Sequence, residues 1–231
     1  MSWVRKTVAS TIGAKFIVAL TGIVLVGFVI GHMLGNLQIF LGQDALNNYA
    51  QMLHNTPALL WSARLVLILS FFAHIGFTIK LTRQNRLARP QTYAYQQSIQ
   101  APTSSRTMIF SGLLVLSFVI YHLLHFTLGV THPEHKSLVD SMGRPDVYSM
   151  VVLGFQNIWV SLSYIVAIIL LGLHLSHGVS SLWQTLGLNH VKYNTFIKAS
   201  GPVLALTLVA GNLSMPVAVL LGFLSLPLGV V

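Results

Sequence analysis

The fold of this chain is decided by the stretch Val29-Ile-Gly-His-Met-Leu-Gly-Asn36, which places His32 inside a long apolar run. The run covers about residues 16–37, enough to cross a bilayer core of about 30 Å as a helix. Three later apolar runs carry a histidine in the same way, at His74, His122 and His174. Because a histidine inside a membrane span is costly, each of the four is a candidate functional residue.

The composition is that of a membrane protein. Hydrophobic residues make up 54% of the 231 positions and charged residues 7%, which excludes an ordinary soluble domain. The chain has no cysteine, which excludes disulfides, thiolate-bound iron–sulfur clusters and c-type haem attachment within it. Its net charge of +9 comes without a basic stripe of interleaved aromatics, so we expect no nucleic-acid partner.

The apolar runs predict five membrane-spanning helices in a single domain that covers residues 1–231. Their expected bounds are about 16–37, 58–80, 107–130, 151–182 and 201–230, the last interrupted by Pro216 and Pro227. Runs this long and this uniformly apolar are typical of helices rather than barrel strands, so the expected fold class is an all-α membrane protein.

Charge is divided between the two ends of the expected bundle. Lys and Arg gather in the N-terminal segment and in the loops 80–106 and 184–198. The acidic residues all fall in the two opposite loops: Asp44, Glu134, Asp140 and Asp146. The positive-inside rule then predicts a cytoplasmic N-terminus and, with five spans, a C-terminus outside.

The four histidines fall into two depth layers. Counted from the basic end of each span at about 1.5 Å per residue, His32 lies about 25 Å deep and His122 about 22 Å. On the same count His74 lies about 9 Å deep and His174 about 13 Å. Depth therefore pairs His32 with His122 and His74 with His174, in layers about 12 Å apart.

Two pairs of neutral imidazoles match the axial ligands of two haems, so we expect the first four helices to form a haem-binding bundle. The competing interpretation is that each histidine is a polar residue hydrogen-bonded between helices. His125 and His177 lie one turn beyond His122 and His174, and depth alone leaves the choice within each doubled pair open. Glycines near the histidines, at positions 27, 31, 35, 76 and 178, would let a macrocycle or a neighbouring helix approach closely.

Five motifs spread over nearly the whole chain carry a family resemblance: Ser10-Thr-Ile-Gly-Ala-Lys15, Ala19-Leu-Thr-Gly22, Gly31-His-Met-Leu-Gly-Asn-Leu-Gln38, Phe118-Val-Ile-Tyr-His122 and His174-Leu-Ser-His-Gly-Val-Ser-Ser-Leu-Trp-Gln-Thr-Leu-Gly-Leu-Asn-His190. With them the chain resembles the single-chain, di-haem cytochrome b membrane subunit of succinate dehydrogenase and fumarate reductase. In that family a glycine typically follows the fourth ligand by four residues, which implies His174 with Gly178. The third ligand follows a Phe-Val-x-aromatic pattern, which implies His122.

The resemblance also implies the function. The subunit would anchor a flavoprotein and an iron–sulfur protein to the cytoplasmic face of a bacterial inner membrane. Electrons from succinate would pass through two haems b to a quinone, either menaquinone or ubiquinone, and fumarate reduction would be the reverse. The chain itself would hold no succinate site.

Five further residues are candidates for cofactor or quinone contacts. Arg64, near the outer end of the second span, would either bind a haem propionate or extend to the lipid interface. Asp44 would assist quinone protonation at an outer site or be an ordinary solvated carboxylate. Ser10, Lys15 and Trp183 would line an inner quinone pocket or lie at the lipid interface.

Two other functions are compatible with the sequence. One is the cytochrome b subunit of another quinone-linked oxidoreductase, such as a formate dehydrogenase or a hydrogenase. The other is a haem-free, proton-coupled transporter whose histidines relay protons. Purification partners separate the first from the succinate enzyme, and a visible spectrum separates the second.

Overall fold

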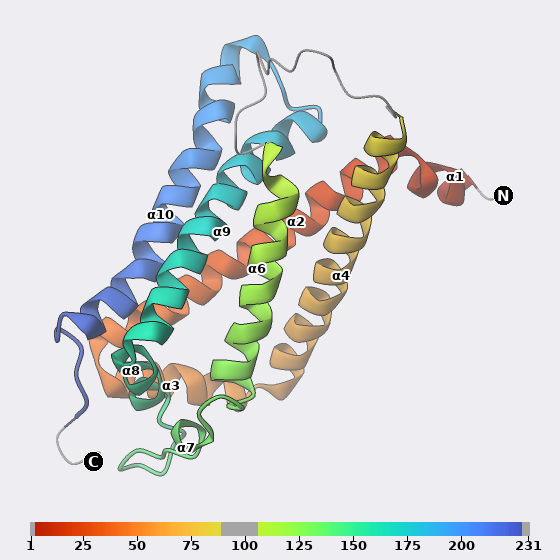
Figure 1. Cartoon of the computed structure of the whole chain (residues 1–231). Helices are drawn as coiled ribbons and strands as arrows, with labels where there is room; N and C mark the ends of the chain where they lie inside the picture. Colours follow the sequence, from red (N-terminus) through yellow and green to blue (C-terminus); the bar gives the residue numbers. More distant parts are fainter. Residues whose placement is uncertain (1–2, 89–105, 228–231) are drawn as a thin grey trace.

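The computed structural model describes residues 3–88 and 106–227, and within these ranges the chain is helical apart from turns and one isolated bridge. Figure 1 shows the helices in chain order: α1 Trp3–Ala9, α2 Thr11–Asn36, η1 Leu37–Leu41, α3 Gln43–His54, α4 Pro57–Leu87, α6 Met108–His122, η2 Leu123–Thr127, α7 Pro133–Lys136, α8 Val147–Gln156, α9 Ile158–Thr185, η3 Val191–Tyr193 and α10 Asn194–Leu220. Five of them, α2, α4, α6, α9 and α10, are long and apolar enough to cross a membrane. The all-α membrane fold with five spanning helices is confirmed.

The two ends of the bundle differ in charge. The upper end in Figure 1 holds α1, the end of α4 and the connection from α9 to α10, and we call it the basic face. The lower end holds α3, α7 and α8, and we call it the acidic face because all four carboxylates lie on it. Successive spanning helices alternate in direction between these faces, as the charge pattern predicts.

The fourth span begins later than predicted. Its predicted start is about residue 151, but residues 147–156 form the separate helix α8 and α9 begins at Ile158. Asn157 makes the break: its backbone is extended and its Oδ1 accepts hydrogen bonds from the main-chain N–H groups of Trp159 and Val160. An asparagine in this geometry is a helix N-cap, so an apolar run that looked continuous is two helices.

The fifth span also differs from its prediction. Its helix, α10, starts at Asn194 and includes Lys198, which was expected in a loop. It continues through Pro202 and Pro216 and ends just before Gly222, whose φ of 78° is the left-handed conformation that terminates helices. Pro216 therefore does not interrupt the span. The predicted end at residue 230 lies outside the described residues.

The first three spans differ from their predicted bounds mainly at the ends. The first starts at Thr11, because Ser10 caps it by accepting a hydrogen bond from the main chain of Gly13. The second extends to Leu87 instead of residue 80. The third is α-helical to His122 and ends at residue 127 with a π-helical turn. The region 38–57, expected as a loop, contains the amphipathic helix α3.

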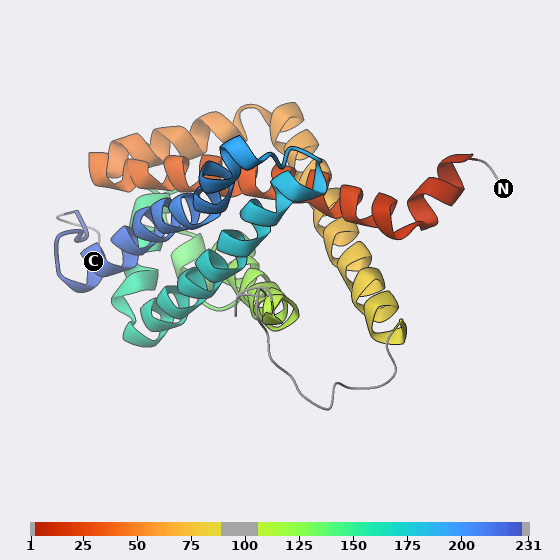
Figure 2. The ribbon, with the colours of Figure 1, turned by 90° about the horizontal axis from the view of Figure 1, so that it is seen from above.

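Apolar packing is concentrated on one side of the bundle. Both clusters of buried apolar side chains are built from α2, α8, α9, α10 and the residues around η1 and α3. Helix α4 contributes no buried residue, and α6 contributes only Ser111. The most extensive helix contacts join α2 with α4, α6 with α9, and α9 with α10. In the view of Figure 2, α10 lies away from α4 and α6. Between the pairs α2/α4 and α6/α9, buried apolar packing comes from α2 and α9, where Met33 lies in one cluster with Leu175.

A polar network closes the acidic face. Asn47 on α3 is fully buried, and its side-chain amide donates to Asp140 at 3.1 Å and to Asp146 at 3.0 Å. Arg144 donates to Asp140 at 2.7 Å and to Asp44 at 2.7 Å. We call these five residues the acidic-face latch, because they tie the connection before α4 to the connection before α8.

The latch makes the stability of the acidic face depend on pH. Burial alone would raise the pKa of the Asp140 carboxyl, but hydrogen bonds from Arg144, Asn47 and Met142 outweigh burial and lower this pKa to about 2. A depressed pKa stabilises the fold above the ordinary value of about 3.9, and this contribution is lost as the pH falls through the folded value. We expect the thermal unfolding midpoint to decrease as the pH is lowered from 4 to 2. In Asp140→Asn this midpoint should decrease less over the same pH range. Glu134→Gln, at an exposed carboxylate, is the control. If the midpoint of Asp140→Asn decreased with pH as much as that of Glu134→Gln and the wild type, the role of Asp140 would be contradicted.

Candidate functional site

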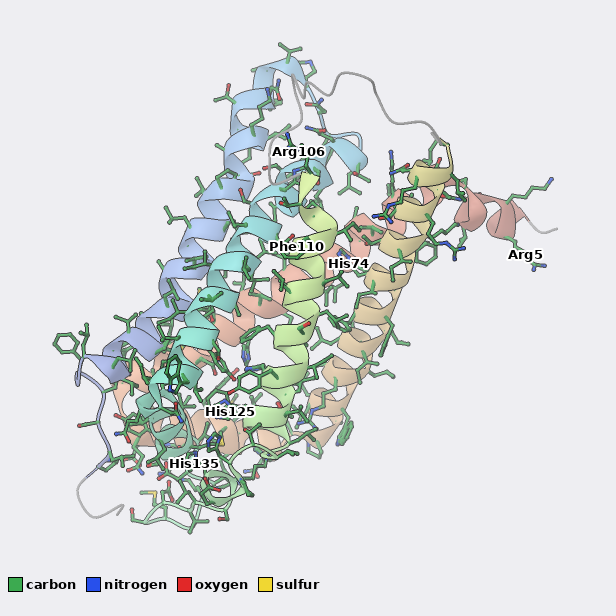
Figure 3. All side chains as sticks on the ribbon, viewed as in Figure 1. Arg5, His74, Arg106, Phe110, His125 and His135 are labelled. Carbon is green, nitrogen blue, oxygen red and sulfur yellow. The ribbon has the colours of Figure 1, made fainter. Side chains whose placement is uncertain are left out.

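The four histidines of the apolar runs lie between the two helix pairs, at two levels of the bundle. His74 on α4 lies in the half nearer the basic face, as Figure 3 shows, and it is close enough to His174 on α9 for the two imidazoles to interact electrostatically. His32 on α2 and His122 on α6 lie toward the acidic face with ring centroids 5.7 Å apart. The structure therefore brings His32 and His122 into ring contact and places His74 within electrostatic range of His174.

The basic-side pair is held in two matching environments. The Nδ1 of His74 lies 3.2 Å from the Thr21 hydroxyl of α2. The Nδ1 of His174 lies 3.2 Å from the Ser111 hydroxyl of α6. In both cases the next residue is a glycine, at which an added Cβ would stand 3.6 Å from the Cε1 of His74 or 3.5 Å from that of His174. Each imidazole is thus packed and hydrogen-bonded by the neighbouring helix.

The acidic-side pair lies among aromatic rings. His32 stacks on Phe28 of its own helix, and its Nε2 lies 3.1 Å from the side-chain amide of Asn36. His122 meets His32 edge to face, and its Nδ1 lies 3.3 Å from the hydroxyl of Tyr164 on α9. A half-turn of the His32 ring would exchange Nε2 with Cε1, so the contact with Asn36 leaves the orientation of this imidazole adjustable.

His125 and His177, which follow His122 and His174 by one helical turn, take different positions from those two residues. His125 is only 3% exposed and packs into the acidic-face layer, where an added Cβ at Gly154 would stand 3.1 Å from its Cε1. Its ring lies 5.3 Å from that of His132, which in turn stacks on His135 at 5.0 Å. His132 and His135 lie in the connection after η2, and both are half-buried in this row. His177 is also half-buried and lies near enough to His174 to interact electrostatically.

Each layer holds one pair of imidazoles from two different helix pairs, His32 with His122 and His74 with His174. Among the described residues no three His, Asp or Glu side chains are placed to hold a metal ion by themselves. A metal with two protein ligands needs its other positions filled by a further group, and the porphyrin of haem supplies four nitrogens in one plane. Two imidazoles at each level are the protein donors that a haem bound through two histidines would need.

Open helix surface lies along the histidine-bearing helices. A Cβ added at Gly27 or Gly31 on α2, at Gly76 on α4 or at Gly178 on α9 would meet no atom within 4 Å. A flat macrocycle or another group could approach the helix backbone at these glycines. Gly35 differs, because a Cβ there would collide with the ring of Tyr49, so this glycine serves helix packing.

Arg64 and Asp44 both lie toward the acidic face. The Arg64 guanidinium stands 4.9 Å from the centre of the Trp61 ring on the same helix and is half-exposed, which suits an interfacial position. The Asp44 carboxylate is 77% exposed and pairs with Arg144 at 2.7 Å. Asp44 thus takes part in the latch between the two acidic-face connections.

The three candidates for an inner quinone pocket lie at the basic face but are not joined by a hydrogen bond or ring contact among the described residues. Ser10 caps α2 and donates to the Thr7 carbonyl at 2.6 Å. Lys15 is exposed on the first turns of α2. The Trp183 indole N–H donates to the Ser200 hydroxyl at 3.0 Å and so links α9 to α10.

Sequence reasoning missed the hydroxyl partners Thr21, Ser111 and Tyr164. A signal for two of them was present, because Thr21-Gly22 and Ser111-Gly112 repeat the same pair of residue types on the two helices that face a histidine. Tyr164 lies in an apolar run with nothing in the sequence to connect it with His122. Comparisons of this chain with models of protein families, with curated proteins and with solved structures find no match.

Proposed function

We propose that this chain is the membrane anchor and electron-transfer subunit of a succinate:quinone oxidoreductase, a succinate dehydrogenase or fumarate reductase. One observation supports it above the others: four histidines from four spanning helices form two pairs at two levels of the bundle. A helical membrane protein that stacks two bis-histidine sites between its faces is built to carry electrons from one face toward the other.

Two haems b fit the residues present. His32 and His122 would bind the iron of the haem near the acidic face, and His74 and His174 that of the haem near the basic face. Each haem supplies a one-electron carrier when bound. The chain's own residues hold the imidazoles in place, exclude water with the aromatic rings around His122, and leave open surface beside the histidines.

The basic face is the side on which the flavoprotein and iron–sulfur subunits would dock. The excess of Lys and Arg there supports a cytoplasmic position for this face, in a chain that would be a multi-pass protein of a bacterial inner membrane. A reporter fused at residue 95, which lies outside the described residues, should behave as cytoplasmic and one at residue 140 as external. The reverse result would exchange the inner and outer haems. Electrons would leave to menaquinone or ubiquinone within the membrane.

The test of this assignment is isolation of the chain with its partners from native membranes. We expect a tag placed at the C-terminus to recover a flavoprotein and an iron–sulfur protein, and succinate to reduce haem in the purified complex. Partners that contain molybdenum or nickel would assign the chain to another quinone-linked oxidoreductase. A haem-free preparation would favour the proton-coupled transporter.

A further inference from the structure

The hydroxyl of Thr21 has a defined direction. It lies 2.7 Å from the main-chain carbonyl of Ile17, closer than the 3.2 Å to the Nδ1 of His74. A hydroxyl has one proton, and a carbonyl oxygen can only accept, so Thr21 donates to Ile17. Its oxygen then accepts from His74, which means that the Nδ1 of His74 carries the ring proton.

The same arrangement recurs on the opposite helix pair. Ser111 is buried, and its hydroxyl lies 3.1 Å from the Met108 carbonyl and 3.2 Å from the Nδ1 of His174. With its proton given to the carbonyl, the Ser111 oxygen accepts from the Nδ1–H of His174. The two basic-side histidines are therefore neutral tautomers whose Nε2 has a free lone pair, the form in which imidazole binds a metal.

Tyr164 stands between two histidines of the acidic side. Its hydroxyl lies 3.3 Å from the Nδ1 of His122 and 3.1 Å from the Nδ1 of His125, and it has no third hydrogen-bond partner among the described residues. The single proton must go to one of these nitrogens, while the other nitrogen donates to the oxygen. Only the histidine whose Nδ1–H donates to the Tyr164 oxygen has an unprotonated Nε2 with a free lone pair. His122 faces His32, whereas His125 packs against Gly154, so we assign the donor role to His122.

We propose that these three hydroxyls are positioning residues, which keep the ring proton of their histidines on Nδ1 and leave Nε2 free to bind haem iron. The inference rests on the proposed function and extends it to residues that do not touch the metal. An acceptor at Nδ1 fixes the orientation of the ring and makes the imidazole a stronger electron donor. A stronger donor favours ferric iron, so each hydroxyl lowers the midpoint potential of its haem.

The experiment uses variants that remove one hydroxyl and little else. In the intact complex, Thr21→Val and Ser111→Ala should each keep both haems and raise the midpoint potential of the basic-side haem alone. The double variant should raise that potential further, because the two hydroxyls act on different ligands of one iron. Thr21→Ser restores the acceptor and should return the potential to that of the wild type.

The controls are hydroxyls that bond only a main-chain carbonyl of their own helix. Thr78 donates to the carbonyl of His74 at 2.6 Å, and Ser117 donates to that of Leu113 at 3.0 Å. We expect Thr78→Val and Ser117→Ala to leave both potentials unchanged. Tyr164→Phe should raise the potential of the acidic-side haem and leave the other at its wild-type value.

Two results separate this inference from the proposed function. Unchanged potentials in Thr21→Val, Ser111→Ala and Tyr164→Phe, with two haems bound, would overturn the positioning role and leave the di-haem function intact. A wild-type complex without haem would overturn the proposed function. Nitrogen-15 NMR of the histidines would then still read the tautomers, and a ring proton on Nε2 of His74 and His174 would overturn the inference by itself.

Discussion

His174→Ala is expected to remove the haem near the basic face completely, whereas His177→Ala is expected to keep it. His174 has its Nδ1 on the Ser111 hydroxyl and its ring over Gly112, within electrostatic reach of His74. His177 has no hydrogen bond of this kind among the described residues. Two positions three residues apart on a helix differ by about 60° around the axis, so they cannot present a ligand to one iron with the same geometry.

The measurement is haem content with redox titration of single variants in the intact complex. The matched pair on the acidic side is His122→Ala, which should lose the other haem, and His125→Ala, which should retain it with a shifted potential. Loss of the basic-side haem in His177→Ala, together with its retention in His174→Ala, would show that the ligand choice is wrong. The two-layer architecture would survive that result.

Asn47→Ala is expected to cause the largest loss of stability outside the histidine layers. The variant removes two hydrogen bonds to the buried carboxylates of Asp140 and Asp146, and a third to the main-chain N–H of Tyr148. Each hydrogen bond to a charged group contributes about 1.5–3 kcal/mol, so we expect a loss of about 3–6 kcal/mol. The measurement is the apparent unfolding midpoint in detergent.

The matched control is the neighbouring residue. Asn48 is exposed and accepts a hydrogen bond from Arg144 at 2.6 Å, so Asn48→Ala removes one solvent-accessible contact of the same network. We expect that variant to stay within about 1 kcal/mol of the wild type. Equal midpoints for Asn47→Ala and Asn48→Ala would mean that the latch does not hold the acidic face together.

The sequence predicts the parts of this fold that depend on hydrophobicity and charge. The five spans, their alternating direction and the grouping of His32 with His122 follow from apolar runs, Lys and Arg positions, and the rise of a helix. These properties are local or periodic, so they can be read without knowing which helices touch. The bounds are less well predicted where a polar side chain acts on the main chain, as Asn157 does at the start of α9.

The contacts between helices are what the sequence does not reveal. Nothing in the run around Tyr164 indicates that its hydroxyl meets His122 and His125, because those residues come from another helix some forty positions away. For the same reason nothing in the sequence indicates that His132 and His135 continue a row of rings from His125. The predicted interruption of the fifth span at Pro216 is also wrong. This proline is fully buried and lies within the continuous helix α10.

The central claim, that two histidine pairs hold two haems, is tested most directly by the haem content of the purified complex. A pyridine haemochrome assay against the amount of this chain should give two haems b per chain, with sharp reduced α-bands of low-spin, bis-histidine iron. A ratio of one would contradict the two-layer site, and a ratio of zero would contradict the haem-binding account altogether.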